Sequence, residues 1–187
     1  MRARLASANP HKLVELRRAL PEWEIEPVED REFPPETGST YAANARGKAL
    51  HGRRSSPVDA WVIGEDSGIE ASGLGGRPGL ASARWASDGV AQLLTELAPL
   101  EDRRARYVCV IVAIGPTGEE IVAEGTLAGT IALDRRGAEG FGYDPIFVPG
   151  GETSTVAELG DEWKTANSHR ARAAGALAAA LETRRRG

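Results

Sequence analysis

Two long strand patterns on either side of a short turn constrain the fold of this chain more than any other feature of its sequence. Residues Arg106 to Ile114 and Glu120 to Leu133 are rich in apolar and β-branched side chains, and Gly115-Pro116-Thr117-Gly118 lies between them. A short turn of this composition typically joins antiparallel strands. We therefore expect a hairpin, and a sheet that contains it cannot be parallel throughout.

The rest of the chain alternates strand patterns with helix patterns. Strands linked by helices usually pair in parallel, so this alternation and the hairpin together predict an α/β protein with a mixed central sheet flanked by helices. The strands are expected at 3–6, 24–28 and 61–64, and the helices at 10–20, 40–53, 88–97 and 168–183. Three of these helices follow residues suited to cap them, namely Asn9, Ser39 or Thr40, and Asp88.

Size and charge limit the functions open to the chain. Its 187 residues, 41% of them apolar, suffice for one substantial core, so we expect a single domain over residues 1–187. A formal net charge of -4 argues against a DNA or RNA polymer as partner, because such partners require a surplus of Lys and Arg. No stretch approaches the ~18 apolar residues of a membrane span, and no secretory h-region follows Met1. We expect a cytoplasmic protein without a membrane partner.

Missing motifs exclude several common kinds of site. The sequence lacks G-x-x-x-x-G-K-[ST], and its glycines at 73, 75, 76 and 79 do not fit G-x-G-x-x-G, which excludes ordinary P-loop and Rossmann sites. The three histidines, His11, His51 and His169, are far apart in the sequence, and the only cysteine is Cys109. A zinc site and an intrachain disulfide are therefore not expected.

The acidic tetrapeptide Glu65-Asp66-Ser67-Gly68 directly follows the strand pattern at 61–64. Open α/β sheets bind ligands beyond the carboxyl ends of their strands, and one or two carboxylates there suit an Mg²⁺ ion that also contacts substrate phosphates. A solvated acidic turn at the end of a strand explains the tetrapeptide equally well. Taken alone, the pattern leaves both interpretations open.

Three further segments carry residues suited to nucleotide binding. Ser7-Ala8-Asn9-Pro10-His11-Lys12 leads into a helix, whose free N–H groups and positive dipole end attract phosphate, although a capped helix with a surface lysine is the commoner case. Phe141-Gly142-Tyr143-Asp144 combines two rings and an acid, which suits stacking on a base, and aromatic packing of the loop is an equal alternative. Lys164 and Ser168-His169-Arg170 offer donors to a base, but alone they are typical of a solvated helix end.

In this order and spacing, the segments resemble the inosine triphosphate pyrophosphatase family along nearly the whole chain. The matching segments are 7–12 for T-x-N-x-x-K, 36–38 for E-T-G, 65–68 for D-D-S-G, 74–84 for L-G-G-x-P-G-x-x-S-A-R, 141–147 for F-G-Y-D-P-I-F, and Lys164 with 168–170 for the late K and S-H-R. Any one motif is weak, but the ordered set is very specific.

The resemblance implies an elongated central mixed β-sheet flanked by helices, with two lobes, a substrate cleft between them and usually a homodimer. It implies an Mg²⁺-dependent hydrolase that acts on the α–β phosphoanhydride of non-canonical purine nucleoside triphosphates. ITP, dITP and XTP would be converted to the monophosphate and pyrophosphate, which removes them from the nucleotide pool.

The resemblance also implies roles for individual residues. Glu36 and Asp66 would bind Mg²⁺, and Asp66 would also accept a proton from the attacking water. The residues expected at the triphosphate and sugar are Ser7, Ala8, Asn9, Pro10, His11, Lys12 and Ser67. Those expected around the base are Phe141, Gly142, Tyr143, Asp144, Lys164, His169 and Arg170.

Three residues depart from the family motifs. Glu65 replaces the first aspartate of D-D-S-G, which keeps the charge on a longer arm and leaves open whether it ligates the metal. Ala43 stands where many members carry a glutamate, and Ala171 replaces a common glycine after S-H-R. If that glutamate assists the metal, this chain must rely more on Glu36, Glu65 and Asp66.

Two alternative functions stay open. One is a related pyrophosphatase that prefers pyrimidine triphosphates, and the other is a nucleotide-binding module that senses without hydrolysing. Pyrophosphate release from ITP, compared with release from dTTP, separates all three.

Overall fold

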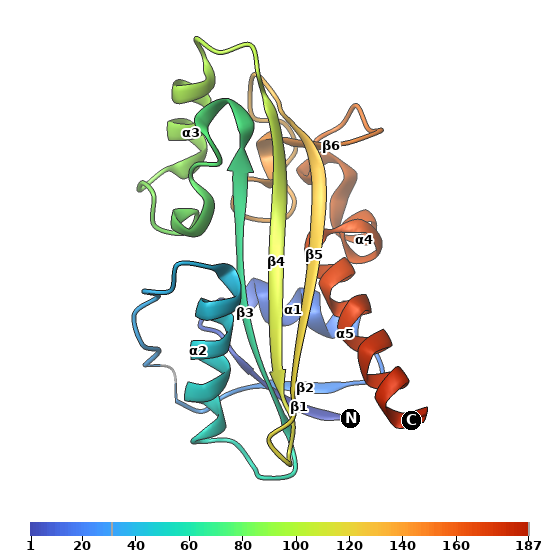
Figure 1. Ribbon diagram of the computed structural model, residues 1–187. Coiled ribbons are helices and arrows are strands. Elements are labelled where there is room, and N and C mark those ends of the chain that lie inside the picture. The colour runs from blue at the N-terminus through green and yellow to red at the C-terminus, as the bar shows by residue number, and fades with distance from the viewer. Residues whose placement is uncertain (31, 187) are drawn as a thin grey trace. The chain divides into compact units, whose positions relative to one another are not determined.

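The computed structural model describes residues 1–30 and 32–186 (Figure 1). Its main elements in chain order are β1 (Arg2–Ala6), α1 (Pro10–Ala19), β2 (Glu24–Pro27), α2 (Tyr41–Arg53), β3 (Trp61–Ala71), α3 (Gly89–Leu97), β4 (Arg104–Ile114), β5 (Glu120–Ile131), β6 (Phe147–Pro149), α4 (Val156–Asn167) and α5 (His169–Arg186). Short 3-10 helices lie at Ser72–Leu74, Gly79–Ala81 and Asp144–Ile146.

The strands form one mixed sheet in the order β2-β1-β3-β4-β5-β6. β1 pairs in parallel with both β2 and β3, whereas β5 and β6 are antiparallel. β4 and β5 are neighbours joined by a turn in which the Gly115 N–H donates to the Glu119 carbonyl oxygen at 2.8 Å. The predicted α/β architecture with a mixed sheet and a long hairpin is confirmed.

Contacts divide the chain into two compact units, each with its own apolar core. Unit 1 comprises Met1–Asp66, Cys109–Gly125 and Arg170–Gly187. Unit 2 comprises Ser67–Val108 and Thr126–His169. Unit 1 packs side chains of α1 and α5 against β1, β3 and β4, and unit 2 packs α3 and the start of α4 against parts of β3, β4 and β5.

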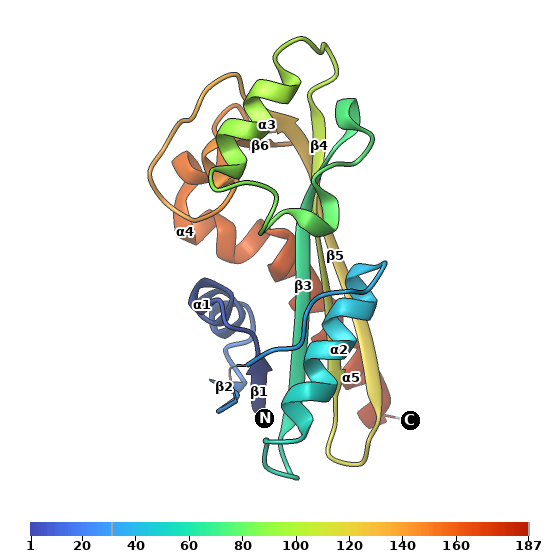
Figure 2. The same ribbon diagram turned by 90° about the vertical axis from the view of Figure 1, so that its left-hand side faces the viewer.

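The sheet of unit 1 is covered on both faces, and side chains of β3 alternate between them. Trp61 and Ile63 belong to the cluster that contains Leu16 of α1 and Leu177 of α5. Gly64 faces α2 instead, because a Cβ at this position would lie 1.9 Å from the carbonyl oxygen of Ala45. The close approach of α2 to β3 is visible in Figure 2. The next two residues of the strand, Glu65 and Asp66, are thereby directed to opposite faces.

The helix starts agree well with the sequence. The Asn9 side chain accepts the N–H of His11 at 2.9 Å, and Pro10 occupies the first turn of α1. Thr40 caps α2 and Asp88 caps α3 through the N–H groups of Ala43 and Ala91. Side-chain acceptors satisfy N–H groups that have no partner inside the helix, which is why these residue types mark helix starts.

Two expectations about the elements were wrong. The strand expected at 61–64 continues to Ala71, so the acidic tetrapeptide lies within β3 and not beyond its end. The strand continues because Ile69 and Ala71 enter the core of unit 2, while the two acids have protein partners. In addition, α4 and β6 occupy a stretch for which no helix or strand was predicted.

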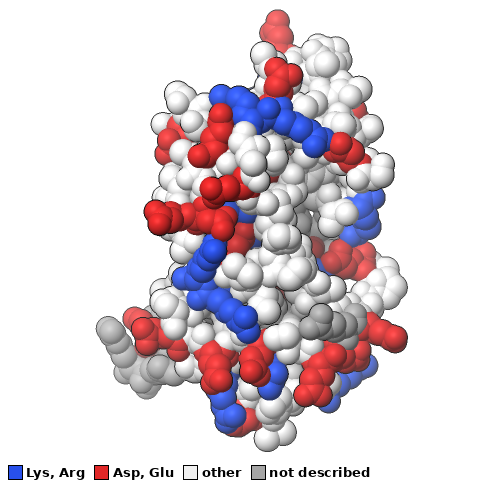
Figure 3. Space-filling view, turned by 180° about the vertical axis from the view of Figure 1, so that it is seen from behind, with Lys and Arg blue, Asp and Glu red and all other residues white. Residues whose placement is uncertain are grey.

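No helix in the described part of the chain combines the length and apolarity that a membrane crossing requires. On the face shown in Figure 3, acidic and basic side chains are interspersed. Among the described residues many charged side chains form exposed ion pairs, of which Arg106 with Glu70 and Arg104 with Asp102 are examples. Pairs of this kind contribute little to stability because water screens them.

Candidate active site

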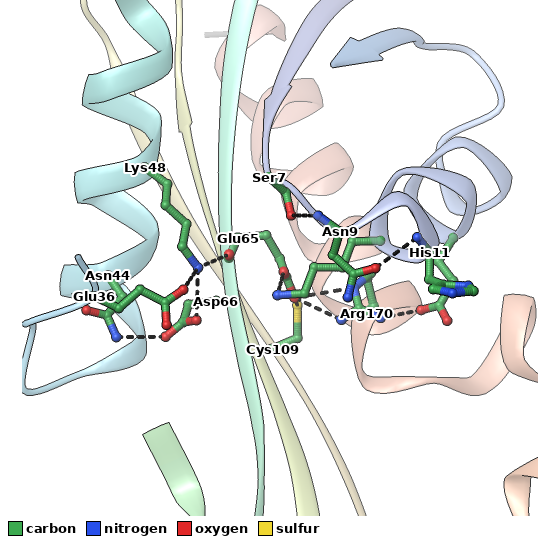
Figure 4. Close-up of polar contacts among 12 residues, drawn as sticks. Ser7, Asn9, His11, Glu36, Asn44, Lys48, Glu65, Asp66, Cys109 and Arg170 are labelled. Carbon is green, nitrogen blue, oxygen red and sulfur yellow. Dashed lines mark hydrogen bonds and ion pairs between the residues drawn. The ribbon is translucent and has the colours of Figure 1, made fainter. Parts of the chain in front are cut away.

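Asp66 forms the first polar cluster, on the face of β3 that α2 covers. The Asn44 side-chain N–H donates to Asp66 Oδ2 at 2.9 Å, and Lys48 Nζ donates to Asp66 Oδ1 at 3.1 Å. Lys48 Nζ also donates to the carbonyl oxygen of Glu65 at 3.1 Å. Figure 4 shows Asn44, Lys48 and Glu36 gathered around Asp66. The aspartate is only 4% exposed, so these partners define most of its surroundings.

Lys48 links the two carboxylates that were predicted to bind metal. Its ammonium contacts Glu36 Oε1 as well as Asp66 Oδ1, so both acids lie around one positive charge. Burial acts to lower the pKa of Lys48, but the charges of Asp66 and Glu36 outweigh it and the pKa is raised. The lysine therefore stays charged. Lys48 was not among the predicted site residues, although Asn44 and Lys48 are one helical turn apart on α2 and form one polar face of that helix.

Asn44 also connects Asp66 to the loop that carries Glu36. Its side-chain oxygen accepts the Gly38 N–H at 2.8 Å, which fixes the orientation of the amide and directs its N–H₂ group toward Asp66. Gly38 is required at this contact, because a Cβ there would lie 2.6 Å from the Asn44 side-chain oxygen. The Glu36-Thr37-Gly38 segment is thus tied to the same helix as Lys48.

The donor set around Asp66 fits a hard divalent cation. Burial raises the pKa of Asp66 and the Glu36 charge adds to this effect, while Lys48 and Asn44 partly oppose it. The Glu36 and Asp66 carboxylates, which both contact the Lys48 ammonium, supply oxygen ligands of the kind that Mg²⁺ prefers. No group of three or more His, Cys, Asp and Glu side chains with metal-binding spacing occurs among the described residues.

Glu65 forms a second cluster, on the opposite face of β3. Its side chain is fully buried, and Lys12 Nζ lies 2.6 Å from Oε2. Oε1 accepts from Arg170 Nη2 at 3.0 Å and from the Cys109 thiol at 3.2 Å, and Arg170 Nη1 contacts Glu15. Burial acts to raise the pKa of Glu65, but Arg170 and Lys12 together hold it well below its ordinary value. Figure 4 shows this carboxylate pointing away from Asp66.

The segment 7–12 surrounds the start of α1 in unit 1. Ser7 Oγ accepts the Asn9 N–H at 3.2 Å, and Asn9 caps the helix, so the loop is ordered by its own side chains. Lys12 points from the first turn of the helix to Glu65 and keeps 14% of its side chain exposed. The predicted contact of this segment with phosphate stays a prediction.

A third cluster lies in unit 2 around Asp144, which is 2% exposed. Asp144 Oδ2 accepts from Lys164 Nζ at 2.6 Å and from the Phe141 N–H at 2.8 Å, and Oδ1 accepts from the Tyr107 hydroxyl at 3.1 Å. Lys164 Nζ lies 4.2 Å from the centre of the Phe141 ring. Tyr107 also stacks on His169, with ring centres 4.5 Å apart and planes inclined by 7°. Tyr107 was not predicted, because a tyrosine in an apolar strand carries no distinctive signal.

The structure brings the predicted residues together in two groups. Glu36 and Asp66 meet in unit 1, and Phe141, Asp144 and Lys164 meet in unit 2. Ser67 follows Asp66 in β3, Gly142 adopts a positive φ of 62°, and the Tyr143 hydroxyl donates to the Ser82 carbonyl oxygen at 3.0 Å. Arg170 lies in unit 1, so its predicted contact with a base stays a prediction.

The chain is similar to known proteins over almost its whole length. A family model described as "Ham1 family" matches residues 3–180. A dITP/XTP pyrophosphatase of Bdellovibrio bacteriovorus is 42% identical over 193 residues, covering 96% of each chain. One of Mycobacteroides abscessus is 40% identical, covering 95% of this chain and 93% of the relative. The solved structure of the Staphylococcus aureus Ham1 protein has a TM-score of 0.85 at 37% identity, covering 98% of this chain and 100% of that one.

Proposed function

The chain belongs to the Ham1 family, and on that premise we propose that it hydrolyses non-canonical purine nucleoside triphosphates, ITP, dITP and XTP, to the monophosphate and pyrophosphate. Relatives that match it over nine-tenths or more of their length are named dITP/XTP pyrophosphatases. The observation in the structure that best supports the proposal is the buried pair Asp66 and Glu36 around Lys48, since it suits metal-assisted attack of water on a phosphate.

We assign the metal and the base to this pair. Glu36 and Asp66 would hold Mg²⁺, which supplies charge neutralisation at the phosphates when it is bound. Asp66 would accept the proton of the attacking water, and its raised pKa suits that role because a base works best when its pKa approaches the working pH. Asn44 donates to Oδ2 of Asp66, and Oδ1 faces Lys48. No covalent enzyme intermediate is needed.

We assign the phosphates to the segment 7–12 and to Ser67. Pro10 has no N–H and the His11 N–H is bonded to Asn9, so the Lys12 N–H and the Lys12 ammonium would stabilise charge that moves onto pyrophosphate as it leaves. These groups keep a fixed geometry because Asn9 caps the helix and Glu65 pairs with Lys12. Donors fixed before the reaction need no reorganisation as charge develops.

We assign base recognition to the cluster in unit 2. The Phe141 ring would stack on the purine, and Lys164 and His169 would donate to its oxo groups. Asp144 orients this set, because it receives both the Lys164 ammonium and the Phe141 N–H. Adenine presents an amino group at the position where these purines carry an oxygen, so donors facing it would be unpaired and ATP rejected. Arg170 remains a further predicted donor to the base.

A panel of triphosphates scored for pyrophosphate release in the presence of Mg²⁺ tests the proposal. We expect rapid release from ITP, dITP and XTP and slow release from ATP and dTTP. Faster release from dTTP than from ITP would support a pyrimidine-specific enzyme. Tight binding of ITP with no release would support a sensing module instead.

A cytoplasmic location and a homodimer complete the proposal, and both rest on the resemblance to the family. Light scattering of the purified protein tests the dimer, with an expected mass of twice that of one chain. A mass equal to one chain at micromolar concentration would contradict it.

A further inference from the structure

Glu65 and Asp66 are adjacent acids whose carboxylates are held by different side chains. Asp66 faces α2, where Asn44 and Lys48 hold it. Glu65 faces α1 and α5, where Lys12 and Arg170 hold it. Consecutive residues of a strand point to opposite faces of the sheet, so this separation is built into β3. Glu65 therefore does not share the metal position of Asp66.

The two oxygens of Glu65 have different tasks. Oε1 receives the Nη2 and Nε groups of Arg170, at 3.0 and 3.3 Å, and the Cys109 thiol at 3.2 Å. Oε2 lies 2.6 Å from Lys12 Nζ. The first oxygen is thus fixed by groups from β4 and α5, and the second holds a lysine from α1. A carboxylate anchored at one oxygen is a rigid acceptor at the other.

Only one end of this ion pair reaches solvent. Glu65 has no exposed side-chain surface, whereas the Lys12 side chain is 14% exposed. A lysine side chain has a flexible stem of four carbons and three N–H donors, so Lys12 can stay paired with the carboxylate and still offer N–H groups to an incoming anion. A lysine held in this way loses less conformational entropy on binding a phosphate than a free one.

We propose that Glu65 is a positioning residue for phosphate binding, which acts by holding Lys12 in the place where it meets the leaving pyrophosphate. The inference rests on the proposed function and deepens it, because it separates the roles of the two adjacent acids. Asp66 serves the metal and the water, and Glu65 serves the phosphate-binding lysine. The cluster of Glu65, Glu15, Lys12 and Arg170 has two charges of each sign, and Arg170 keeps Glu65 in place while Lys12 contacts both Glu65 and phosphate.

Binding of inorganic pyrophosphate, measured by calorimetry, provides a test that does not depend on turnover. Glu65→Gln keeps the shape and one acceptor oxygen for Arg170 and Cys109, but its N–H₂ group cannot accept from Lys12. We expect pyrophosphate to bind about 10-fold or more weakly, the effect of losing one charged hydrogen bond. Binding of inosine, which has no phosphate, should change by less than twofold.

A double-mutant cycle with Lys12→Ala distinguishes positioning from a structural role. If Glu65 acts through Lys12, then adding Glu65→Gln to Lys12→Ala should weaken pyrophosphate binding by less than a further twofold. Equal losses in the presence and absence of Lys12 would overturn the inference. Cys109→Ser is the matched control, because it keeps a donor to the same carboxylate and does not contact Lys12. Its affinity for pyrophosphate should stay within twofold of the parent.

Three further outcomes are possible, and each has a stated consequence. If Glu65→Gln does not fold, the cycle is run with Glu65→Asp, which keeps the charge and shortens the arm, and the same dependence on Lys12 is expected. A parent that binds pyrophosphate but releases none from ITP would contradict the proposed function, while the cycle would still decide the role of Glu65. A parent that does not bind pyrophosphate would overturn the inference directly.

Discussion

At the scale of single residues, adjacent acids in β3 have opposite electrostatic surroundings. Burial raises the pKa of Asp66, whereas burial of Glu65 is outweighed by the charges of Arg170 and Lys12, which lower its pKa. Carboxylates whose pKa values are pushed apart by their surroundings commonly divide the work of a site. Here the acid that is easier to protonate is the one proposed as base, and the acid that stays charged holds a cation.

Asp66→Asn should lose most of its turnover and remain folded. Asparagine keeps the shape of the side chain and removes the charge that a base requires, and base catalysis typically contributes ~10²-fold or more. Steady-state hydrolysis of ITP measures the loss, and the midpoint of thermal unfolding measures the fold. A variant with turnover within about threefold of the parent would show that Asp66 is not the base.

Glu65 should make the stability of the fold depend on acid pH. Its pKa in the folded chain lies below the ordinary value of 4.5, so the folded state binds fewer protons than the unfolded chain. The stabilisation is therefore fully present above pH 4.5 and is lost as the pH falls toward the folded pKa. Thermal unfolding of the parent and of Glu65→Gln, compared from neutral pH downward, should show a gap that narrows below that value. A constant gap would contradict this account.

At the scale of elements, the approach of α2 to β3 positions the Asp66 cluster. The two elements touch at Gly64, where a Cβ would meet the Ala45 carbonyl oxygen at 1.9 Å and the Ala49 nitrogen at 2.6 Å. Backbone atoms cannot move aside as a side-chain tip can. The absence of a side chain at Gly64 thus sets how near Asn44 and Lys48 come to Asp66.

Gly64→Ala should push α2 away from β3 and lower both stability and activity. Overpacking in a close contact typically costs about 1–3 kcal/mol, and displacement of Asn44 and Lys48 should reduce turnover further. Gly47→Ala is the matched control in the same helix, because nothing lies within 4 Å of a Cβ there. It should stabilise α2 by up to about 1 kcal/mol, since alanine is the better helix former. Urea unfolding and ITP hydrolysis of both variants provide the comparison.

Local signals in the sequence located most helices and strands, but they predicted the ends of these elements less reliably. Asn9, Thr40 and Asp88 mark helix starts through bonds to nearby N–H groups, which depend on only a few residues. The extension of β3 was missed because acids usually end a buried strand, and their partners come from distant segments. α4 was missed because Gly160, at a φ of 82°, interrupts its helical pattern.

The candidate site was predictable in part for the same reason. The motif resemblance singled out Glu36 and Asp66, and in the structure both carboxylates contact the Lys48 ammonium. The resemblance did not identify Lys48, which contacts both of these acids, or Tyr107, which contacts both Asp144 and His169. Such roles depend on contacts between residues that are distant in the sequence, and these contacts cannot be read from a single sequence.

At the scale of the whole molecule, each unit carries polar clusters of its own. Unit 1 contains the carboxylates with Lys12, and unit 2 contains Ser67 and the cluster around Asp144. In both units these side chains are largely buried and have protein partners. The fold alone therefore holds these side chains in position. We expect a metal ion to be needed for turnover more than for folding.

Removal of metal should abolish activity and leave the protein folded. We expect hydrolysis of ITP to stop in excess chelator and to return when Mg²⁺ is added back. Lys48 already neutralises part of the charge of Glu36 and Asp66, so the midpoint of thermal unfolding should change little with chelator. Full activity in excess chelator would contradict the assigned metal, and unfolding on chelation would show that the ion is structural.

The buried thiol of Cys109 has a practical consequence. It is the only cysteine of the chain, and burial together with the charge of Glu65 raises its pKa well above the ordinary value. Reagents that label thiols react with the ionised sulfur, so labelling requires that β4 first separate from its neighbours. The rate of labelling in native buffer therefore reports how often the core of unit 1 opens, and it does so without an introduced probe.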